Sequence, residues 1–418
     1  MKVLWITNIL FEHHRTMMGL DATVVVGGSW LNAAYASSLG AGGLQLHIAT
    51  VADISERRTG EREGNYFYIL PGGGSRNYDI DSPSNLREWE RLRKEVQPDA
   101  VIVWGTETRA AYLATKVMHG IPTAIYMQGV MSAISDHFYE GVPHQYQCRT
   151  LRDYLNTFNK SAEYNHFLRQ TALEKEMFRM ADAVIVENDW CEDMCHVVNP
   201  ALKVLRNDLP IRDIFYHGQW SLEKMEPHTI FSNAGGYPIK GHHILFNALG
   251  KMKKQYPDFK CYLPGEKLDT FKNLKRRTGY TSYLERLICE NGLQNNVIYT
   301  GVLTTEQMVA HLERCNVYVM PSMVENHSSS LIEAMMVGVP CVTSLVGGIA
   351  SLVQPGKDAL LYNSLDSDSL AGCIMRLFSN KELAANLSAN ALKMRDHRSR
   401  NFGDEMLNVY KTLVGFCQ

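Results

Sequence analysis

Two glutamates that could act together lie in residues 321–340, whose sequence is PSMVENHSSSLIEAMMVGVP. The segment follows an apolar strand pattern over Val317–Met320 and leads into a short helix, so Glu325 falls in the loop and Glu333 in the first turns of the helix. Both carboxylates can therefore face the crevice at the carboxyl end of the strand, where open α/β sheets bind ligands. The spacing also permits a simpler interpretation, because Ser330 and Glu333 match the S-x-x-E capping box.

The start of the same helix is a candidate anion-binding site. We expect a helix body over Leu331–Val337, capped by Ser329 or Ser330 and ended by Gly338. The backbone amides of Ser328, Ser329 and Ser330 would lie at the positive end of the helix dipole. That position favours an anion such as a diphosphate.

A lysine flanked by glycines offers a second phosphate ligand. The sequence SNAGGYPIKG, residues 232–241, separates a strand expected over Thr229–Phe231 from a helix expected over His242–Met252. Lys240 presents a point charge that can contact a phosphate, and the backbone N–H groups around Gly236 can form a nest that binds the same group. A lysine and a glycine before a helix are common and indicate no function by themselves. The phosphate-binding interpretation depends on the position of this segment relative to the two glutamates.

Composition narrows the class of protein. A length of 418 residues predicts two domains, each able to bury its own core. The 42 basic and 44 acidic residues nearly balance, which argues against a nucleic acid partner. The nine cysteines lack the paired spacing of zinc sites, and Cys191 and Cys195 are more simply explained as thiols on one helix face. Neither a signal peptide nor an apolar run of about 20 residues is visible, so we expect a soluble protein of a reducing compartment.

The order of the elements predicts where the domains divide. Apolar strand patterns alternate with helical patterns, beginning with a strand over Lys2–Thr7. We place the domains at residues 1–205 and 206–400, with a C-terminal helix in residues 401–418, because periodicity is lost between about 205 and 226. In the first domain the pair Gly27 and Gly28 precedes a helix pattern, where the backbone can approach a ligand closely.

The order strand, Pro-Ser, loop glutamate, capped helix with a second glutamate, Gly-x-Pro and then Val346-Gly347-Gly348 resembles the E-x7-E region of the family-4 retaining glycosyltransferases. The family's order of elements can be followed over nearly the whole chain. The resemblance implies an α/β protein of the GT-B fold, with two Rossmann-like domains facing a central cleft. It also implies that the last helix, expected over Phe402–Val414, crosses back onto the N-terminal domain.

The resemblance implies roles for the residues that match the family's motifs. Glu325 would contact the hydroxyls of the donor sugar and is our candidate catalytic residue, while Glu333 would hold the ribose hydroxyls. Lys240 would bind the donor diphosphate from the C-terminal domain, and Gly27 and Gly28 would approach it from the N-terminal domain.

Two positions depart from the family's pattern, and two histidines remain open. Gln128 stands where the family often has a histidine, and an amide can exchange hydrogen bonds but cannot carry a proton. Gly235 and Gly236 occupy the region where the family usually has an arginine before the lysine, so a glycine nest would bind the phosphate instead. We expect His13 and His14 in a loop after the first strand, where they could reach an acceptor or could simply be polar surface residues.

The activity that the resemblance implies is retaining transfer of a sugar from a nucleotide-diphosphate sugar to a glycan or lipid-linked glycan. The family is described as reacting on one face of the sugar, with the leaving phosphate helping to deprotonate the acceptor. We expect no cofactor and no metal, because the D-x-D triplets Asp79–Asp81 and Asp366–Asp368 lie among turn-forming residues and do not follow a buried strand. A role in polysaccharide biosynthesis implies a cytoplasmic location that could include peripheral association with the inner face of a membrane.

Three other functions fit parts of the sequence. A nucleotide-sugar epimerase would use the same two-domain fold with different acid and base residues. A non-catalytic sugar-nucleotide-binding protein would explain Gln128 and the missing arginine. An oxidoreductase with two α/β domains is disfavoured, because the glycines do not complete the G-x-G-x-x-G fingerprint.

Overall fold

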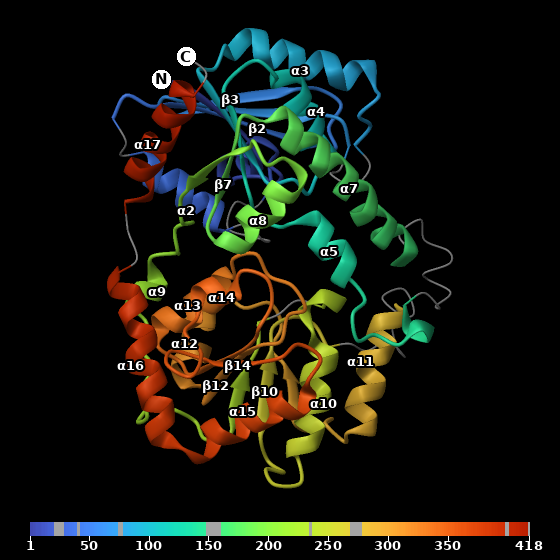
Figure 1. The fold of residues 1–418 in the computed structure, drawn as a ribbon, viewed down its shortest axis with the longest axis vertical. Helices are drawn as coiled ribbons and strands as arrows, with labels where there is room; N and C mark the ends of the chain where they lie inside the picture. The colour runs from blue at the N-terminus through green and yellow to red at the C-terminus, as the bar shows by residue number, and fades with distance from the viewer. Residues whose placement is uncertain are drawn as a thin grey trace. The chain divides into compact units, whose positions relative to one another are not determined.

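The chain forms two α/β units, each built around its own sheet (Figure 1). The first unit comprises Met1–Ser132, His166–Pro210 and Ser399–Gln418, and the second comprises Ala133–Asn165 and Ile211–Arg398. This computed structural model describes residues 1–20, 29–39, 42–73, 78–147, 160–233, 236–267, 278–397 and 401–416.

The first unit contains an eight-stranded sheet in the order β3-β4-β2-β1-β5-β6-β7-β8. Only β3 runs antiparallel to its neighbour, and β5, β6 and β7 are buried at every residue, as expected for strands covered on both faces. The strands are β1 (Lys2–Ile6), β2 (Gln45–Ala52), β3 (Arg58–Arg62), β4 (Asn65–Pro71), β5 (Ala100–Trp104), β6 (Thr123–Tyr126), β7 (Ala183–Val186) and β8 (Lys203–Arg206).

The direction of winding in this sheet reverses between β1 and β5. After β1 the chain builds β2 and β4 outward on one side, and then passes β1 to build β5, β6, β7 and β8 on the other side. In open α/β sheets such a reversal creates a crevice at the carboxyl ends of the two strands, and ligands bind there.

The C-terminal helix α17 (Phe402–Gly415) belongs to the first unit, which confirms the prediction that the last helix returns to the N-terminal domain. It packs against α2 (Ser29–Ser38), and its apolar residues join the core that contains Val3 and Trp5. The indole N–H of Trp5 donates to the hydroxyl of Tyr410 over 3.1 Å. The other helices of this unit are α1 (Glu12–Met17), α3 (Pro83–Val96), α4 (Arg109–Met118), most of α7 (Lys160–Met180) and α8 (Asp189–Val198). Helix α5 (Met131–His137) begins in this unit and lies mostly in the second.

The second unit contains a parallel six-stranded sheet in the order β11-β10-β9-β12-β13-β14, and its winding reverses between β9 and β12. The strands are β9 (Thr229–Phe231), β10 (Lys260–Leu263), β11 (Val297–Tyr299), β12 (Val317–Met320), β13 (Cys341–Ser344) and β14 (Leu360–Tyr362). The α-helices are α9 (Ile214–His217), α10 (His242–Met252), α11 (Gly279–Glu290), α12 (Thr305–Arg314), α13 (Ser329–Val337), α14 (Ile349–Leu352), α15 (Ser367–Ser379) and α16 (Lys381–His397), with 3-10 turns η1 (His144–Tyr146) and η2 (Pro238–Lys240).

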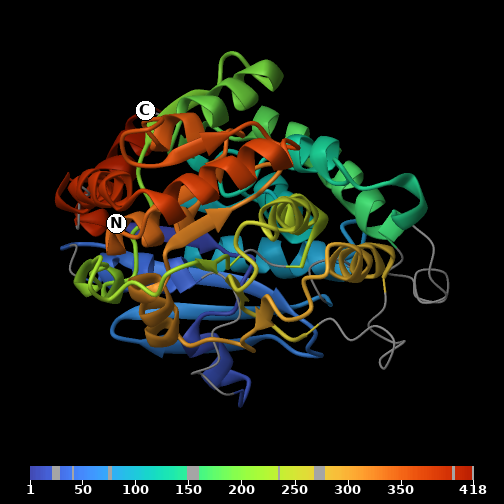
Figure 2. The same ribbon diagram turned by 90° about the horizontal axis from the view of Figure 1, so that it is seen from below.

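Residues 133–165 join the second unit although the chain on either side of them belongs to the first. In this segment the ring of Tyr146 stacks on Tyr283 of α11 with centroids 4.9 Å apart, and His243 of α10 contacts the carbonyl oxygen of Glu140 at 3.0 Å. Figure 2 shows the two receiving helices, α10 in yellow and α11 in gold, lying side by side.

One local prediction needs correction: the segment with His13 and His14 is the helix α1 and not a loop. The hairpin β3–β4 forms in a stretch for which the sequence analysis made no prediction. Among the described helices, none is both long and apolar enough to cross a membrane.

Candidate functional site

The candidate site lies at the winding reversal of the second unit, where loops leave β9 and β12. The backbone N–H of Met323, in the loop after β12, donates to the carbonyl oxygen of Ile239 in η2 over 2.7 Å. Gly241 has φ +69°, and a Cβ there would lie 1.7 Å from the carbonyl oxygen of Pro321. The glycine after Lys240 is therefore required by the close approach of two backbone segments. This contact fixes Lys240 beside the loop that carries Glu325.

Lys240 and Glu325 form an ion pair with 2.6 Å between Nζ and Oε1. The hydroxyl of Ser322 donates to the same Oε1 over 2.6 Å. The main chain of Glu325 is also fixed, because the N–H of Gly348 donates to its carbonyl oxygen over 3.0 Å and a Cβ at Gly347 would lie 2.0 Å from that oxygen. Within the described residues no donor reaches Oε2 of Glu325, so this oxygen can accept a hydrogen bond from a ligand.

Glu333 pairs with an arginine that the sequence analysis did not identify. Nε and Nη2 of Arg212 lie 3.0 and 2.8 Å from Oε1 of Glu333, and Nη1 of Arg212 donates to the hydroxyl of Thr305 over 2.9 Å. The Arg212 guanidinium also lies over the ring of Phe215, 4.7 Å from its centroid. Burial raises the pKa of Glu333, and the positive charge of Arg212 opposes that rise. The pair therefore holds a largely buried carboxylate in one orientation.

The start of α13 differs by one residue from the prediction. Ser328, and neither Ser329 nor Ser330, is the N-cap, because its hydroxyl accepts the N–H of Leu331 over 3.3 Å. The alternative interpretation of Glu333 as the partner in a capping box is wrong, since its carboxylate pairs with the arginine described above. The N–H groups of Ser329 and Ser330 have no acceptor among the described residues, as expected at the first turn of a helix. These amides remain available for an anion.

The remaining predicted donor-side residues are glycines. Gly236 is exposed, and a Cβ built there would meet nothing within 4 Å, so neither packing nor a close contact explains it. Gly27, Gly28 and Gly235 lie outside the described residues.

The three predicted acceptor-side residues, His13, His14 and Gln128, have different surroundings in the structure. His14 is fully buried, and its ring accepts the N–H of Phe11 at Nδ1 over 3.2 Å and contacts the carbonyl oxygen of Ile48 from Nε2 at 3.3 Å. Burial lowers the pKa of His14 to about 3, so the ring is neutral. A buried ring with both nitrogens engaged cannot contact an acceptor, and the prediction for His14 is wrong. His13 is partly exposed beside Phe67, and Gln128 is the second residue after the carboxyl end of β6.

The two D-x-D triplets have structural roles. The carboxylate of Asp366 accepts the N–H groups of Asp368 and Ser369 over 3.1 and 2.9 Å and thereby caps α15. Asp79 accepts the N–H of Asp81 over 3.0 Å in a turn. The part of the chain that the structure describes contains no group of three or more His, Cys, Asp or Glu side chains arranged to hold a metal ion.

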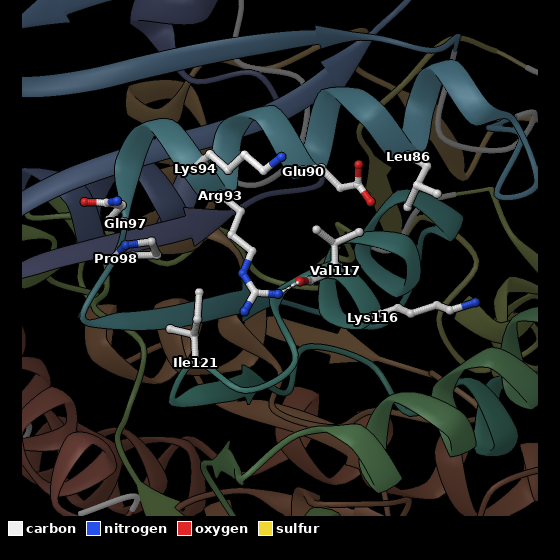
Figure 3. A pocket seen from close by; sticks show the side chains of 9 residues that line it. All are labelled: Leu86, Glu90, Arg93, Lys94, Gln97, Pro98, Lys116, Val117 and Ile121. Atoms are coloured by element: carbon white, nitrogen blue, oxygen red, sulfur yellow. Dashed lines mark hydrogen bonds between the residues drawn. The ribbon is translucent and has the colours of Figure 1, made fainter.

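The groove shown in Figure 3 lies in the first unit, at the amino ends of strands β5 and β6. It has a volume of about 840 Å³ and is bordered by Pro98 and Ile121, which precede β5 and β6 and do not follow them. Arg93 crosses it and donates to the carbonyl oxygen of Val117 over 2.5 Å. Open α/β sheets bind ligands at the carboxyl ends of their strands, so the position of this groove is not the one expected for a ligand site of the sheet. Its other lining residues are Leu86, Glu90, Lys94, Gln97 and Lys116.

Known proteins resemble this chain in sequence over part of its length. Residues 215–394 match the family model described as Glycosyl transferases group 1. The chain is 24% identical over 164 residues to mannosylfructose-phosphate synthase of Agrobacterium fabrum, covering 39% of this chain and 34% of that protein. It is 25% identical over 155 residues to the GDP-mannose-dependent alpha-(1-6)-phosphatidylinositol monomannoside mannosyltransferase of Mycolicibacterium smegmatis, covering 35% of this chain and 38% of that protein. The chain thus spans little more than a third of the length of these relatives.

Solved structures resemble the whole chain. Sucrose-phosphate synthase from Thermosynechococcus elongatus has a TM-score of 0.73 and 17% sequence identity, with 99% of each chain covered. HepE from Anabaena in complex with UDP-glucose has a TM-score of 0.66 and 16% identity, with 99% of this chain and 100% of that chain covered. These likenesses confirm the predicted fold class: the protein has the GT-B fold of two Rossmann-like α/β domains.

Proposed function

We propose that this chain is a retaining glycosyltransferase that moves a sugar from a nucleotide-diphosphate sugar to a hydroxyl of a glycan or lipid-linked acceptor, without a metal ion. The observation that carries the proposal is the pair of cation–carboxylate contacts at the winding reversal of the second unit, Lys240 with Glu325 and Arg212 with Glu333. Both glutamates and the lysine fall within the segment that matches group 1 glycosyl transferases.

The positive groups of the site suit a diphosphate leaving group. The ammonium of Lys240 and the N–H groups of Ser329 and Ser330, which have no acceptor in the described part of the chain, are donors that can stabilise the charge developing on the departing phosphate. In the free protein the ammonium is held by Glu325, so diphosphate binding would replace a carboxylate with a phosphate as its partner.

The carboxylates suit the hydroxyls of a nucleotide sugar. Glu325 has one oxygen engaged by Lys240 and Ser322 and the other available to a hydroxyl of the transferred sugar. Glu333, fixed by Arg212, would accept a ribose hydroxyl in the same way. A hydrogen bond from a neutral donor to a carboxylate is worth about 1.5–3 kcal/mol, which is enough to orient a bound sugar.

The proposed reaction balances without a protein nucleophile. The bond between the anomeric carbon and the phosphate oxygen breaks, and the acceptor oxygen bonds to the anomeric carbon on the same face. The proton of the acceptor hydroxyl moves to the leaving diphosphate. The protein's part is to orient the sugar and to stabilise the negative charge of the leaving group.

A nucleotide-binding experiment tests the site directly. We would measure the thermal unfolding of wild type and Lys240→Ala with UDP, GDP and ADP, in the presence of a chelator. A nucleotide at a hundredfold excess over its Kd should stabilise the wild type by about 2.7 kcal/mol, and the stabilisation should be much smaller in Lys240→Ala. Lys251→Ala is the matched control, because Lys251 pairs with Asp368 on an exposed surface of the same unit.

Transfer assays then separate the candidate functions. Glu325→Ala should retain nucleotide binding and lose transfer, and full activity in that variant would refute the role of Glu325. Binding without transfer or slow hydrolysis would favour the non-catalytic alternative. Scrambling of the donor's sugar stereochemistry without an acceptor would identify an epimerase.

A further inference from the structure

A second polar site lies at the winding reversal of the first unit's sheet, between β1 and β5. Asn8 follows the carboxyl end of β1, and Glu107 follows the carboxyl end of β5. Nδ2 of Asn8 lies 3.5 Å from Oε2 of Glu107, and the N–H of Gly129, just after β6, donates to Oε1 of Glu107 over 2.9 Å. Three adjacent strands thus bring these groups together at the place where open α/β sheets bind ligands.

The backbone is shaped around the Glu107 carboxylate. Gly105 has φ +85°, and a Cβ there would lie 1.9 Å from Oε2 of Glu107. A side chain at position 105 would thus both strain the backbone and displace the carboxylate. The glycine is explained by the space that the carboxylate needs.

The neighbouring carboxylate of Glu174 provides a comparison, because it is a buried glutamate whose hydrogen bonds are all made within the protein. Glu174 of α7 is fully buried and accepts three hydrogen bonds, from the hydroxyl of Thr106 over 2.5 Å and from the N–H groups of Met131 and Ser132 over 3.0 and 3.4 Å. Glu107 accepts from the N–H of Gly129 and from its own backbone N–H, has a long contact from Asn8, and is partly exposed. Burial nevertheless raises the pKa of Glu107 to about 7. Glu107 is therefore a partly buried carboxylate whose Oε2 has, among the described side chains, only the long contact from Asn8.

The unfilled positions at this site are hydrogen-bond acceptors. When Glu107 is ionised its carboxylate only accepts, and the amide of Asn8 turns its nitrogen toward it, which directs the amide oxygen away. Oδ1 of Asn8 is buried and has no hydrogen-bond partner among the described residues. A ligand that satisfies Oδ1 of Asn8 and Oε2 of Glu107 must offer two donors close together, as neighbouring hydroxyls of a sugar or polyol do.

We propose that Asn8 and Glu107 form a hydroxyl-binding subsite for a sugar or polyol group of the acceptor, with Glu107 as a specificity-determining residue. This inference rests on the proposed function, since it names the chemistry of the acceptor that the transferase takes. It places acceptor recognition on a carboxylate and a carboxamide, and it assigns no part of it to the buried His14.

Saturation-transfer NMR tests the subsite without needing the natural acceptor. The probes are D-glucose, D-mannose, D-fructose, N-acetyl-D-glucosamine and myo-inositol, each free and as a monophosphate, with the full chain in the presence and absence of UDP or GDP. At pH 8, where Glu107 is ionised, at least one probe should bind the wild type. Glu107→Gln should raise the Kd of that probe about tenfold or more, because a bond to a charged acceptor is lost while the shape is kept. Asn8→Ala should weaken the same probe.

The control is Glu95→Gln, which removes a carboxylate of the same unit that pairs with Arg57 near β3 and β4 and should leave probe binding unchanged. If no probe binds the wild type, or if Glu107→Gln binds as the wild type does, the subsite is refuted. Nucleotide-induced thermal stabilisation of the same samples keeps the two proposals apart. Its absence in the wild type would refute the donor site, and its presence in both wild type and Glu107→Gln shows that a loss of probe binding is confined to the acceptor side.

Discussion

Removing Arg212 should destabilise the second unit strongly, because it leaves Glu333 buried and unpaired. In Arg212→Ala, Oε1 of Glu333 loses both of its donors at 2.8 and 3.0 Å, and Thr305 loses its bond to Nη1. The Glu333 side chain is only 9% exposed and that of Arg212 21%, so water cannot fully replace the lost partner.

The magnitude follows from the burial of the pair. Breaking a buried ion pair from one side costs about 3–5 kcal/mol, and we take the lower end because Arg212 retains some contact with solvent. A loss of about 3 kcal/mol lowers the Tm of a unit of this size by about 6–12 °C. Glu226 and Arg314 form a matched pair in the same unit, with side chains 42% and 64% exposed. Arg314→Ala should cost about 1 kcal/mol or less.

The pH dependence identifies the cause of the loss. Burial already raises the pKa of Glu333, and without Arg212 that pKa should rise further. When folding raises the pKa of a carboxyl, the protein loses stability as the pH rises from the carboxyl's pKa in the unfolded state toward its pKa in the folded state. The deficit of Arg212→Ala should therefore be small at pH 5 and large at pH 8, as measured by scanning calorimetry.

A double variant gives the result that could refute this reasoning. If the unpaired charge causes the loss, Glu333→Gln introduced into Arg212→Ala should restore at least half of the lost Tm at pH 8. The reasoning fails if the second substitution restores nothing, or if Arg212→Ala is no more destabilising than Arg314→Ala.

Three further predictions rest on single contacts. Gly241→Ala should destabilise the protein by more than about 1 kcal/mol in thermal unfolding, because its Cβ would lie 1.7 Å from the oxygen of Pro321 at φ +69°. Ser328→Ala should cost about 1 kcal/mol through loss of the α13 cap, whereas Ser329→Ala should change stability by less than about 0.5 kcal/mol. The pKa of Glu107 is about 7 against an ordinary value of 4.5, so wild type should lose about 3 kcal/mol between pH 4.5 and 7, at about 1.36 kcal/mol per unit. The free energy of unfolding of Glu107→Gln should lack that pH dependence. Above pH 7 the variant should therefore be more stable than wild type, relative to the difference between the two proteins at pH 4.5.

Local signals predicted most of the parallel strands. Runs such as Ala183–Val186 and Val317–Met320 are short, apolar and bounded by turn residues, which is the pattern of a strand covered on both faces. Lys240 and Glu325 could be placed at one site from the sequence, because each follows a recognisable strand and parallel strands of one sheet end at one edge; their ion pair was not predicted. The hairpin β3–β4 was missed because β3 is an exposed edge strand of charged and polar residues with no apolar run.

The residues that the sequence analysis misjudged depend on contacts distant along the chain. Arg212 lies 121 residues before Glu333, and nothing in the local sequence around either residue predicts the pair. His14 appears polar in sequence, yet its ring is buried because Phe11 and Ile48 supply backbone partners for both nitrogens. Asn8 and Glu107 are 99 residues apart, and only the winding of the sheet brings them together.

The return of α17 to the first unit has a consequence for the order in which the protein can mature during synthesis. Trp5 leaves the ribosome well before its partner Tyr410, which follows 405 residues later. Until then the face of the sheet that contains Val3 and Trp5 lacks the helix that covers it. The first unit, although it comes first in the sequence, should therefore be the last to reach its final packing. A nascent chain that stops before α17 should expose this apolar face and depend on chaperones.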